Sequence, residues 1–372
     1  MIYIVIGTRA QLVKMAPVIK KIEERPWPLA LLHTGQHKES ISEICRDFRI
    51  VSPWHYLYRS THEVKTIFHA LKWLLSVLFV IAVKPYSLLP DYNNRDDHII
   101  LVHGDTFSTV IGALLGKRTG IPIAHIESGL RSFNWLNPFP EELNRLLTFR
   151  LIDMAFCPGK WAIGNLHRYK ITKINTIHNT LLDALKIAVQ SKTETHYPIP
   201  QRPYGVVSIH RFENIFFTRQ FTLIIDQILS IADRYHLVFV LHPATHKRLQ
   251  KTGLIDKLAH HQQIELRHRT GYFNFVKLLA SSQFVITDGG SNQEELSYLN
   301  IPTFLMRKTT ERQEGLGSSV SLGKLSDSAL DDFLNRLSSG SNRNVDFLGF
   351  NDSPSDLICQ HIAFAANKVN NT

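Results

Sequence analysis

The residues of this sequence that could do chemistry follow short apolar runs of the chain. Asp105 comes directly after ILVHG, and Glu127 ends the run IPIAHIE. A third carboxylate, Glu141, lies in the segment PEELNR. A carboxyl group at the end of a buried strand is partly desolvated, which suits it to act as an acid or a base. The pattern therefore favours a reaction in which protons are moved.

Two of these carboxylates also have a structural interpretation, which the sequence leaves open. Asp105 precedes a helix that we expect to begin near Thr106, and Asp is a favoured N-cap residue. Glu141 and Arg145 are four residues apart on another expected helix, where they could form a simple ion pair. Caps and ion pairs alone do not account well for the joint placement of these groups after strands.

A turn near residue 289 could bind an anion. The apolar run FVITD, residues 284–288, is followed by Gly289, Gly290 and Ser291, and then by a helical pattern. Glycines let a ligand approach the backbone, and the first N–H groups of a helix lack internal partners, so a phosphate would be well placed there. Gly and Ser are also common in tight turns, which is the structural alternative.

The residues after this turn carry charges of both signs. We expect Glu294 and Glu295 in the first turn of the helix, where the helix dipole favours one negative charge. Glu295, turned away from the phosphate, could accept hydrogen bonds from ribose hydroxyls. Arg312, on a later loop, could balance the charge.

Further cations and imidazoles follow other strands. Arg9 and Lys14, at the first expected strand-to-helix turn, could together hold a diphosphate or could be ordinary surface cations. His210 and Arg211 end a strand in the second half of the chain, and His242 ends the next strand. We include all five among the expected site residues.

The elements that must position these residues alternate along the chain. Runs rich in Val and Ile recur between segments of helical spacing, such as residues 11–23 and 218–234. This alternation predicts parallel sheets covered by helices on both faces. The predicted strands form two series, 2–7, 29–35, 98–105, 121–127 and 154–159, then 204–210, 236–243, 264–269, 284–288 and 302–307.

Two series of strands predict an α/β protein with two doubly wound, Rossmann-like domains, and 372 residues fit two domains. We expect an N-terminal domain over residues 1–185, which carries the carboxylates, and a C-terminal domain over residues 186–352. The proline-containing segment 190–203 is expected to link them. Such sheets bind ligands at the carboxyl ends of their strands, so the expected site residues of both domains would face one cleft.

Composition narrows the function further. The net charge of +10 suits phosphorylated ligands, nucleic acid or anionic lipid, but the sequence contains no nucleic-acid-binding motif, and we expect no nucleic acid partner. Cys45, Cys157 and Cys359 lie too far apart for a disulfide framework or a zinc site. The N-terminal run IYIVIG is typical of a first strand rather than a signal peptide, so we expect a cytoplasmic protein.

One apolar segment is unusual. Residues 70–83, ALKWLLSVLFVIAV, carry a single charge, Lys72, and are fewer than the roughly 20 residues that cross a bilayer. A fully buried helix is one interpretation. The other is peripheral contact of residues 65–86 with the inner face of a membrane, which Lys65, Lys84 and Trp73 would support.

Eight motifs follow the order found in bacterial UDP-N-acetylglucosamine 2-epimerases, a family that the chain resembles. They are GTRAQLVKMAPVI, HTGQH, LVHGDTFSTVIGA, IAHIESGLRS, PEELNR, SIHRFEN, TDGGSNQEE and TTERQEGL. The resemblance implies a two-domain fold of the GT-B type, in which residues 353–372 form a helix that returns to the N-terminal domain. It also implies UDP bound mainly by the C-terminal domain, no metal or redox cofactor, and a homodimer.

The resemblance implies an activity as well. A UDP-linked N-acetylhexosamine would be inverted at C2 by elimination of UDP to a glycal and readdition, for surface polysaccharide precursors. Asp105, Glu127 and Glu141 would be the catalytic carboxylates, assisted by His210. Together with the strand-end residues described above, the expected substrate-binding set is Arg9, Lys14, Arg145, Arg211, His242, Gly289, Gly290, Ser291, Glu295 and Arg312.

The chain departs from the family pattern at several places. GTRAQ stands where the family usually has GTRPE, TDGGS where it has TDSGG, and His178 where it has a glycine. Residues 50–96 lack the usual polar loop, and we do not carry over the allosteric site to which positions near Gln36 and His37 contribute in some members. Two other activities stay open, a GT-B glycosyltransferase with a lipid-linked acceptor and a hydrolysing 2-epimerase. Exposure of residues 65–86 beside the cleft would favour the transferase, and burial of these residues would favour the epimerase.

Overall fold

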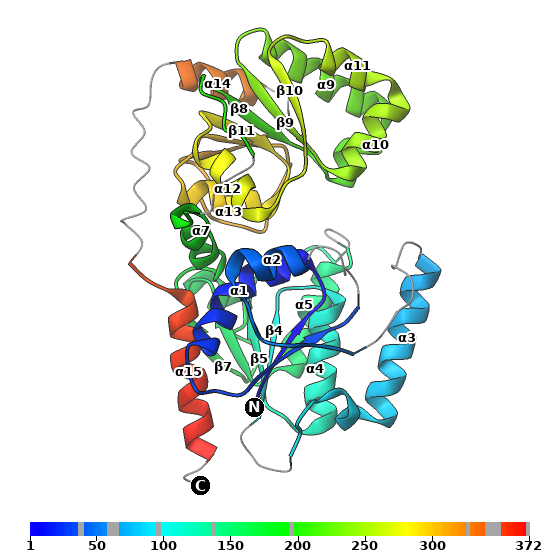
Figure 1. Cartoon of the computed structure of the whole chain (residues 1–372), viewed down its shortest axis with the longest axis vertical. Coiled ribbons are helices and arrows are strands. Elements are labelled where there is room, and N and C mark those ends of the chain that lie inside the picture. The colour runs from blue at the N-terminus through cyan, green and yellow to red at the C-terminus, as the bar shows by residue number, and fades with distance from the viewer. Residues whose placement is uncertain are drawn as a thin grey trace. The chain divides into compact units, whose positions relative to one another are not determined.

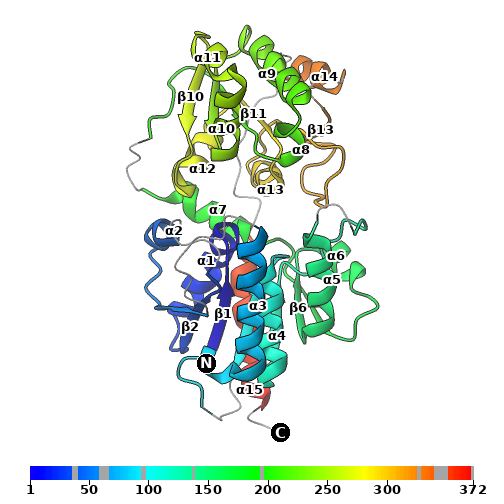
Figure 2. The same cartoon turned by 90° about the vertical axis from the view of Figure 1, so that its right-hand side faces the viewer.

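A computed structural model of the chain describes residues 1–35, 41–57, 67–93, 98–135, 139–192, 197–324, 328–338 and 351–369 (Figures 1 and 2). The chain divides into two compact units, Met1–Ala184 with Asp352–Thr372 as unit 1 and Leu185–Asn351 as unit 2. Each unit is built on a parallel sheet with helices on both faces, which confirms the predicted two-domain α/β fold. Gln36, His37 and Lys65, named above, lie outside the described residues.

Unit 1 contains seven parallel strands in the order β3-β2-β1-β4-β5-β6-β7. The order reverses between β1 and β4, so this sheet has a topological switch point there, where ligands of such sheets commonly bind. The strands are β1 (Ile2–Ile6), β2 (Leu29–His33), β3 (Trp54–Tyr56), β4 (Ile99–His103), β5 (Ile123–Ile126), β6 (Met154–Cys157) and β7 (Thr172–Asn175). The helices are α1 (Arg9–Glu23), α2 (Ile41–Phe48), α3 (Ile67–Val83), α4 (Phe107–Thr119), α5 (Glu141–Leu151) and α6 (Lys160–Asn165), with a 3-10 turn η1 (Pro85–Leu88). Helix α7 (Leu181–Gln190) begins in unit 1 and ends in unit 2.

Glycines bring helix α4 close to the sheet beneath it. A Cβ atom on Gly112 would lie 2.6 Å from Val102 Cγ1, and one on Gly116 would lie 2.3 Å from Ile123 Cγ1. The helix can therefore pack directly on β4 and β5, with the residues after those strands at its N-terminal end. This close packing sets where Asp105 and Glu127 stand.

The last helix, α15 (Pro354–Val369), packs on unit 1 along α1 (Figure 1). Its first turn is fastened by Asp183, which accepts a hydrogen bond of 2.8 Å from the Ser355 backbone N–H. Lys21 Nζ of α1 lies 3.1 Å from Asp356 Oδ2. Unit 1 is thus assembled from two pieces of chain that are separated in sequence by the whole of unit 2.

Unit 2 contains six parallel strands in the order β10-β9-β8-β11-β12-β13, and this order reverses between β8 and β11. Its strands are β8 (Gly205–Ser208), β9 (Leu237–Leu241), β10 (Ile264–His268), β11 (Phe284–Thr287), β12 (Thr303–Leu305) and β13 (Val320–Leu322). Its helices are α8 (Phe212–Ile215), α9 (Thr218–Ala232), α10 (Pro243–Thr252), α11 (Leu254–Ala259), α12 (Tyr272–Ala280), α13 (Gly290–Tyr298) and α14 (Ser328–Ser338).

The ten strands predicted from the sequence are all present. Three short strands, β3, β7 and β13, were not predicted. Their sequences WHY, TKIN and VSL are only partly buried, which leaves no apolar run for a pattern to detect. They lie at the outer positions of the two sheets, where one side of the strand has no neighbouring strand to bury it.

The interpretation of residues 70–83 as a fully buried helix is wrong. One face of α3 does pack into the core through Trp73, Val77 and Ile81. The opposite face is open to solvent, where Leu75, Phe79 and Val83 are 58%, 68% and 56% exposed. We call these three residues the α3 stripe. Among the described helices, none is both long and apolar enough to cross a membrane.

Candidate active site

The turn after β1 is organised by Gln11 rather than by a charge. Thr8 is the N-cap of α1, and its side chain accepts a hydrogen bond from the Gln11 backbone N–H. The Gln11 side chain accepts hydrogen bonds from the backbone N–H groups of Gly7 at 3.0 Å and Thr8 at 3.2 Å. Its Nε2 donates to the His103 carbonyl oxygen at 2.7 Å, which ties the turn to β4. The Gln11 side chain, one of the departures noted above, is buried and links this turn to β4 by hydrogen bonds.

Lys14 lies one turn further along α1, and its ammonium group is buried against a carboxylate. Its Nζ is 2.5 Å from Glu127 Oε2, and both side chains are more than nine-tenths buried. Glu127 follows β5 with a φ of 62°, a left-handed backbone conformation that is uncommon outside glycine. His103, the last residue of β4, places its Nε2 3.2 Å from the same Oε2 atom. Lys14, which we expected to bind a diphosphate, is therefore ion-paired with Glu127, which we expected to be a catalytic carboxylate.

Asp105 stands beside this cluster, after the neighbouring strand. Its role as an N-cap is ruled out, because the N-cap of α4 is Thr106. The Asp105 carboxylate is 2.5 Å from Arg145 Nη2, and the Asn144 side chain donates to the Asp105 carbonyl oxygen at 2.9 Å. Helix α5 thus fixes both the backbone and the side chain of Asp105.

The partner of Arg145 on its own helix is Glu142 rather than Glu141. Arg145 Nη1 lies 3.1 Å from Glu142 Oε2, and Arg131 also binds Glu142. These cations, with a hydrogen bond from the Ser132 N–H, hold the pKa of Glu142 below its ordinary value although burial opposes them. Glu141 takes no part in these contacts, and its Oε2 is buried and accepts no hydrogen bond from the described residues. This oxygen could accept a hydrogen bond from a ligand.

Arg9 forms an ion pair between the first two helices of unit 1. It opens α1, and its Nη1 lies 3.2 Å from Glu43 Oε2 on α2. The side chain of Glu43 is 38% exposed, so this ion pair is open to water and to competing anions. A phosphate could displace the carboxylate at little cost.

In unit 2, Asp288 organises the ends of β8 and β11. Its carboxylate accepts hydrogen bonds from the backbone N–H groups of His210 at 3.0 Å and Arg211 at 2.9 Å, and from Asn214 Nδ2 at 3.0 Å. His210 Nδ1 also lies 3.1 Å from Asp288 Oδ1, while the His210 side chain is 37% exposed. Asp288 therefore orients the imidazole through its Nδ1 edge, and the exposed part of the ring can contact a ligand.

The glycine turn lies directly against these residues. Gly289 is the N-cap of α13, and Gly290 and Ser291 open the helix. A Cβ atom on Gly289 would lie 3.2 Å from His210 Cε1, and one on Gly290 would lie 3.3 Å from Arg307 Nη1. The two glycines thus allow a histidine and an arginine to approach the start of a helix, which is a favourable arrangement for binding phosphate.

The carboxylates of α13 are one turn deeper than expected. The helix begins at Gly290, so Glu294 and Glu295 lie in its second turn, away from the turn at 289–291. Arg312 binds Glu294, so its charge is balanced by the neighbour of the residue expected to bind ribose. Glu295 is buried beside Tyr272, and burial together with this carboxylate raises the pKa of the phenol.

His242 lies next to His210 at the same edge of the sheet. It is the N-cap of α10, and its ring centroid is 5.3 Å from that of His210. Burial, with positive charge at His210 and Arg269, lowers the pKa of His242 to about 4. His242 is therefore neutral at physiological pH and acts as a hydrogen-bonding group rather than as a cation.

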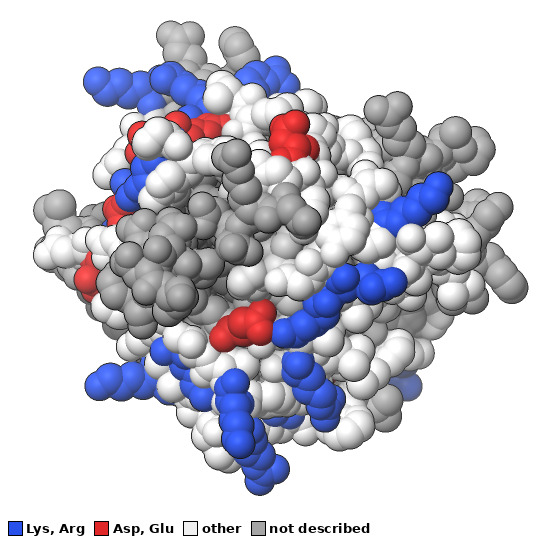
Figure 3. All heavy atoms as spheres, turned by 90° about the horizontal axis from the view of Figure 1, so that it is seen from below, with Lys and Arg blue, Asp and Glu red and all other residues white. Residues whose placement is uncertain are grey.

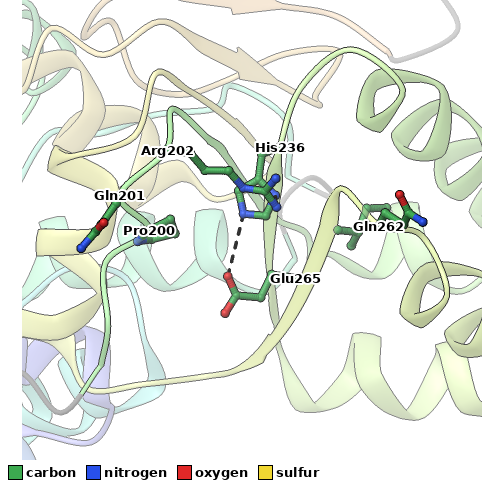
Figure 4. A pocket seen from close by; sticks show the side chains of 7 residues that line it. Pro200, Gln201, Arg202, His236, Gln262 and Glu265 are labelled. Carbon is green, nitrogen blue, oxygen red and sulfur yellow. Dashed lines mark hydrogen bonds and ion pairs between the residues drawn. The ribbon is translucent and has the colours of Figure 1, made fainter.

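A groove in unit 2 is unrelated to the expected site residues. It has a volume of about 550 Å³ and lies at the amino ends of β9 and β10, opposite to the strand edge that carries His210 and His242. Arg202, His236 and Glu265 line it, with His236 Nε2 3.9 Å from Glu265 Oε2 (Figure 4). Its position outside the carboxyl ends of the strands makes it a poor candidate for the active site.

Comparison with known proteins places the chain among sugar-nucleotide enzymes. The model of a family described as UDP-N-acetylglucosamine 2-epimerase matches residues 20–329. A UDP-N-acetylglucosamine 2-epimerase of Methanococcus maripaludis is 33% identical over 328 residues, which is 84% of each chain. A UDP-2,3-diacetamido-2,3-dideoxy-D-glucuronate 2-epimerase of Pseudomonas aeruginosa is 32% identical over 87% of this chain and 88% of the relative.

Solved structures agree with these relatives. The UDP-GlcNAc 2-epimerase of Methanocaldococcus jannaschii, solved with UDP-GlcNAc and UDP, matches with a TM-score of 0.80 and 26% identity over 98% of this chain and 99% of that one. The enzyme of Neisseria meningitidis bound to UDP-GlcNAc matches with a TM-score of 0.79 and 26% identity over 97% of this chain and 99% of that one.

Proposed function

The chain belongs to the UDP-N-acetylglucosamine 2-epimerase family, and we propose that it inverts C2 of a UDP-linked N-acetylhexosamine. The observation that carries this proposal is the pair of carboxylates at the ends of neighbouring strands β4 and β5, each bound to a cation from a helix. An acid and a base held side by side suit a reaction that removes one proton and returns one.

In this reaction UDP leaves C1 as the C2–H bond breaks. The C1–O bond electrons depart with the diphosphate, and the C2–H electrons form the C1=C2 bond of a glycal. Readdition of UDP to C1 and of a proton to the opposite face of C2 completes the inversion, so no atom is gained or lost. Asp105, Glu127 and Glu141 would share the proton transfers, and the unused Oε2 of Glu141 would accept a substrate N–H or O–H.

Unit 2 would hold the UDP. The start of the nine-residue helix α13, at Gly290 and Ser291, would offer its first N–H groups to the diphosphate, while the Gly289 N–H already donates to Thr287 Oγ1. His210 would donate to a phosphate oxygen, with Arg211 and His242 beside it, and Arg9, Lys14 and Arg145 would supply positive charge in unit 1. Glu295 would bind the ribose, and Arg312 would act through Glu294. Hydrogen-bond donors and cations of this kind stabilise the charge of a leaving diphosphate.

The test is incubation of the purified protein with UDP-GlcNAc in heavy water, followed by proton NMR. The proposal predicts UDP-ManNAc with deuterium at C2, because the proton that returns comes from exchanged carboxyl groups. Free ManNAc plus UDP would instead establish a hydrolysing epimerase. If the protein binds UDP but the C2 proton of UDP-GlcNAc does not exchange with the solvent, the proposal is wrong for this substrate.

A second candidate function is favoured by the α3 stripe. A glycosyltransferase that uses the same UDP site and a lipid-linked acceptor would need an apolar surface at a membrane, and Leu75, Phe79 and Val83 form one in unit 1. Two exposed cations stand at the end of this helix, since Lys84 directly follows α3 and Arg118 donates to the Ala82 carbonyl oxygen at 3.1 Å. Lys and Arg side chains outnumber Asp and Glu on the face seen from below (Figure 3). Transfer of radiolabelled sugar from UDP-GlcNAc to a polyprenyl phosphate in vesicles would establish this activity.

For the partner of the stripe we propose a second copy of the chain. Two such stripes would pack against each other in a homodimer. This contact would remove from water apolar side chains that are more than half exposed in the single chain, which is favourable. Peripheral membrane contact through residues 65–86, of which 67–86 are described, is the alternative. We also propose a cytoplasmic location, where the unpaired Cys45, Cys157 and Cys359 would stay reduced.

A further inference from the structure

The first turn of α5 carries a buried carboxylate that is not among the expected site residues. Glu142 is fully buried, and it directly follows Glu141, one of the expected catalytic groups. A buried charge is costly unless charged partners compensate it, so the position of Glu142 must be explained by the groups that it binds.

Both oxygens of the Glu142 carboxylate accept hydrogen bonds. Arg131 donates to Oε1 through its Nε. Oε2 accepts from the Ser132 backbone N–H at 3.0 Å and from Arg145 Nη1 at 3.1 Å. Because these donors hold the pKa of Glu142 below its ordinary value, the carboxylate is ionised at physiological pH. Its two oxygens are therefore directed to two different arginines.

Arg145 is the link between Glu142 and the site. Its two terminal nitrogens bind different carboxylates, Nη1 to Glu142 Oε2 at 3.1 Å and Nη2 to Asp105 Oδ2 at 2.5 Å. Arg131, Glu142, Arg145 and Asp105 thus form a series of alternating charge. The Arg145 side chain is 4% exposed and that of Asp105 is 26% exposed, so the series ends at the member that is most open to a substrate.

A guanidinium with two anchors has a defined plane. The group is planar and its N–H donors form a rigid fork, so a contact at one terminal nitrogen helps to fix the direction of the other. Loss of the Glu142 anchor would let the guanidinium turn about its contact with Asp105. Asn144 supports Asp105 as well, but it does so at the backbone carbonyl oxygen. The direction of the Asp105 carboxylate therefore depends on how Arg145 is held.

We propose that Glu142 is a positioning residue for Asp105, on which it acts through Arg145. The inference rests on the proposed function, since the direction of the Asp105 carboxylate matters for catalysis only if Asp105 transfers protons. Glu142 is not a catalytic residue, because it reaches the reacting atoms only through Arg145 and Asp105. The two adjacent glutamates of α5 thus have different tasks, Glu141 at the substrate and Glu142 behind Arg145.

The test compares Glu142→Met with Glu142→Gln in the epimerase assay. Methionine has a similar length but no oxygen to hold an arginine, whereas glutamine keeps one oxygen that can accept from Arg145 and Ser132 at the position of Oε2. We expect kcat to fall about tenfold or more in Glu142→Met while KM stays within about twofold, and Glu142→Gln should recover most of the loss. The proposal is wrong if kcat does not fall in Glu142→Met, if both variants lose it equally, or if only KM changes.

A matched control at Glu23, the last residue of α1, separates positioning from stability. The Glu23 side chain is 7% exposed, and its Oε1 accepts from the backbone N–H groups of Val51 at 2.9 Å and Ser52 at 2.8 Å. Glu23→Met therefore removes a buried, hydrogen-bonded carboxylate from the same unit. It should lower the denaturant midpoint of unfolding, as Glu142→Met does, but leave kcat unchanged. A fall of kcat in Glu23→Met equal to that in Glu142→Met would remove the positioning role.

A crystal structure of Asp105→Ala tests the anchor with Glu142 intact and without an activity assay. This variant removes one of the two carboxylates that hold Arg145. We expect the guanidinium to keep its place, with Nη1 within hydrogen-bond distance of Glu142 Oε2. A guanidinium that has turned away from Glu142 would overturn the inference whatever the activity. If the anchor holds but the wild-type protein does not epimerise UDP-GlcNAc, only the proposed function fails.

Discussion

At the scale of single residues, the carboxylates of unit 1 differ in what surrounds them. Glu127 is held by Lys14 and lies beside His103, Asp105 is clamped by Arg145, and Glu141 keeps an unused buried oxygen. Three carboxyl groups of one chemical type therefore stand in three different environments. This difference comes from their partners, not from their positions in the sequence.

Removal of the proton-transferring group from Glu127 should abolish turnover while sparing nucleotide binding. The amide of Glu127→Gln keeps the size of the side chain but cannot carry the proton, and we expect kcat to fall by about 10² to 10⁴. UDP affinity, measured by calorimetry, should change by less than about threefold because the proposed UDP contacts are in unit 2. The matched control is Glu24→Gln, at an exposed glutamate. Full activity of Glu127→Gln would contradict the assigned role.

The stability of the protein should depend on pH through His125. Burial lowers its pKa from 6.5 to about 4, so the unfolded chain binds a proton at mildly acidic pH and the folded chain does not. The stabilisation is complete above pH 6.5 and is lost as the pH falls toward about 4, by about 3 kcal/mol in all. Denaturant unfolding at several pH values measures this loss, and His125→Gln should flatten the slope. A variant with the slope of the wild type would rule out this assignment.

The strand ends illustrate what the sequence can predict at the residue scale. Asp105 and Glu127 could be found because each follows an apolar run, and both strands were predicted. Lys14 could not be paired with Glu127 in advance, since 113 residues separate them and only the sheet order brings α1 to β5. Glu142 was missed because the pairing on α5 runs at a spacing of three residues rather than four.

At the scale of elements, the links between helices and strands decide where the site residues stand. Gln11 joins the turn before α1 to the end of β4, Asn144 joins α5 to Asp105, and Asp288 joins β11 to the turn after β8. Each link satisfies backbone groups that would otherwise be buried without partners. Patterns of hydrophobicity predict the strands and helices themselves, but not these polar links between them.

Loss of the Gln11 link should destabilise unit 1. Gln11→Ala leaves the Gly7 and Thr8 N–H groups without their side-chain acceptor, at a cost of about 2–4 kcal/mol. It also removes one of two side-chain donors to the His103 carbonyl oxygen, which keeps the Thr109 hydroxyl. Gln11→Glu should fall between wild type and alanine, because a carboxylate can accept from the N–H groups but cannot donate to the carbonyl. Chemical denaturation measures both. Equal stability of Gln11→Glu and Gln11→Ala would contradict the role given to the Nε2 donor.

The glycine turn of α13 should be equally sensitive, but in binding rather than in stability. A methyl group in Gly289→Ala would meet the His210 ring at 3.2 Å and push it from the Asp288 carboxylate. We expect UDP affinity to fall about tenfold, as for loss of one good contact. Gly164→Ala, at a helical glycine with open space around it, is the matched control. Unchanged UDP binding in Gly289→Ala would remove the turn from the proposed site.

At the scale of the whole molecule, the α3 stripe predicts association. Light scattering should give twice the 42.6 kDa mass of the chain, and the double variant Leu75→Ser/Phe79→Ser should be monomeric. Leu223→Ser, at a leucine of α9 that is 48% exposed, should remain dimeric. A monomeric wild type that floats with anionic vesicles would assign the stripe to membrane contact instead. A dimer unaffected by the double variant would place the interface elsewhere.

The return of α15 to unit 1 has a consequence for how the protein is made. Unit 2 is continuous in sequence and can finish folding as soon as residues 185–351 have left the ribosome. Most of unit 1 emerges first. The unit stays incomplete until α15, whose Ile358, Cys359 and Ile362 are buried, has been made and packs along α1. The unit that begins the chain is therefore the last to be completed during synthesis. Until then, the surface of α1 that receives α15 is exposed and available to a chaperone.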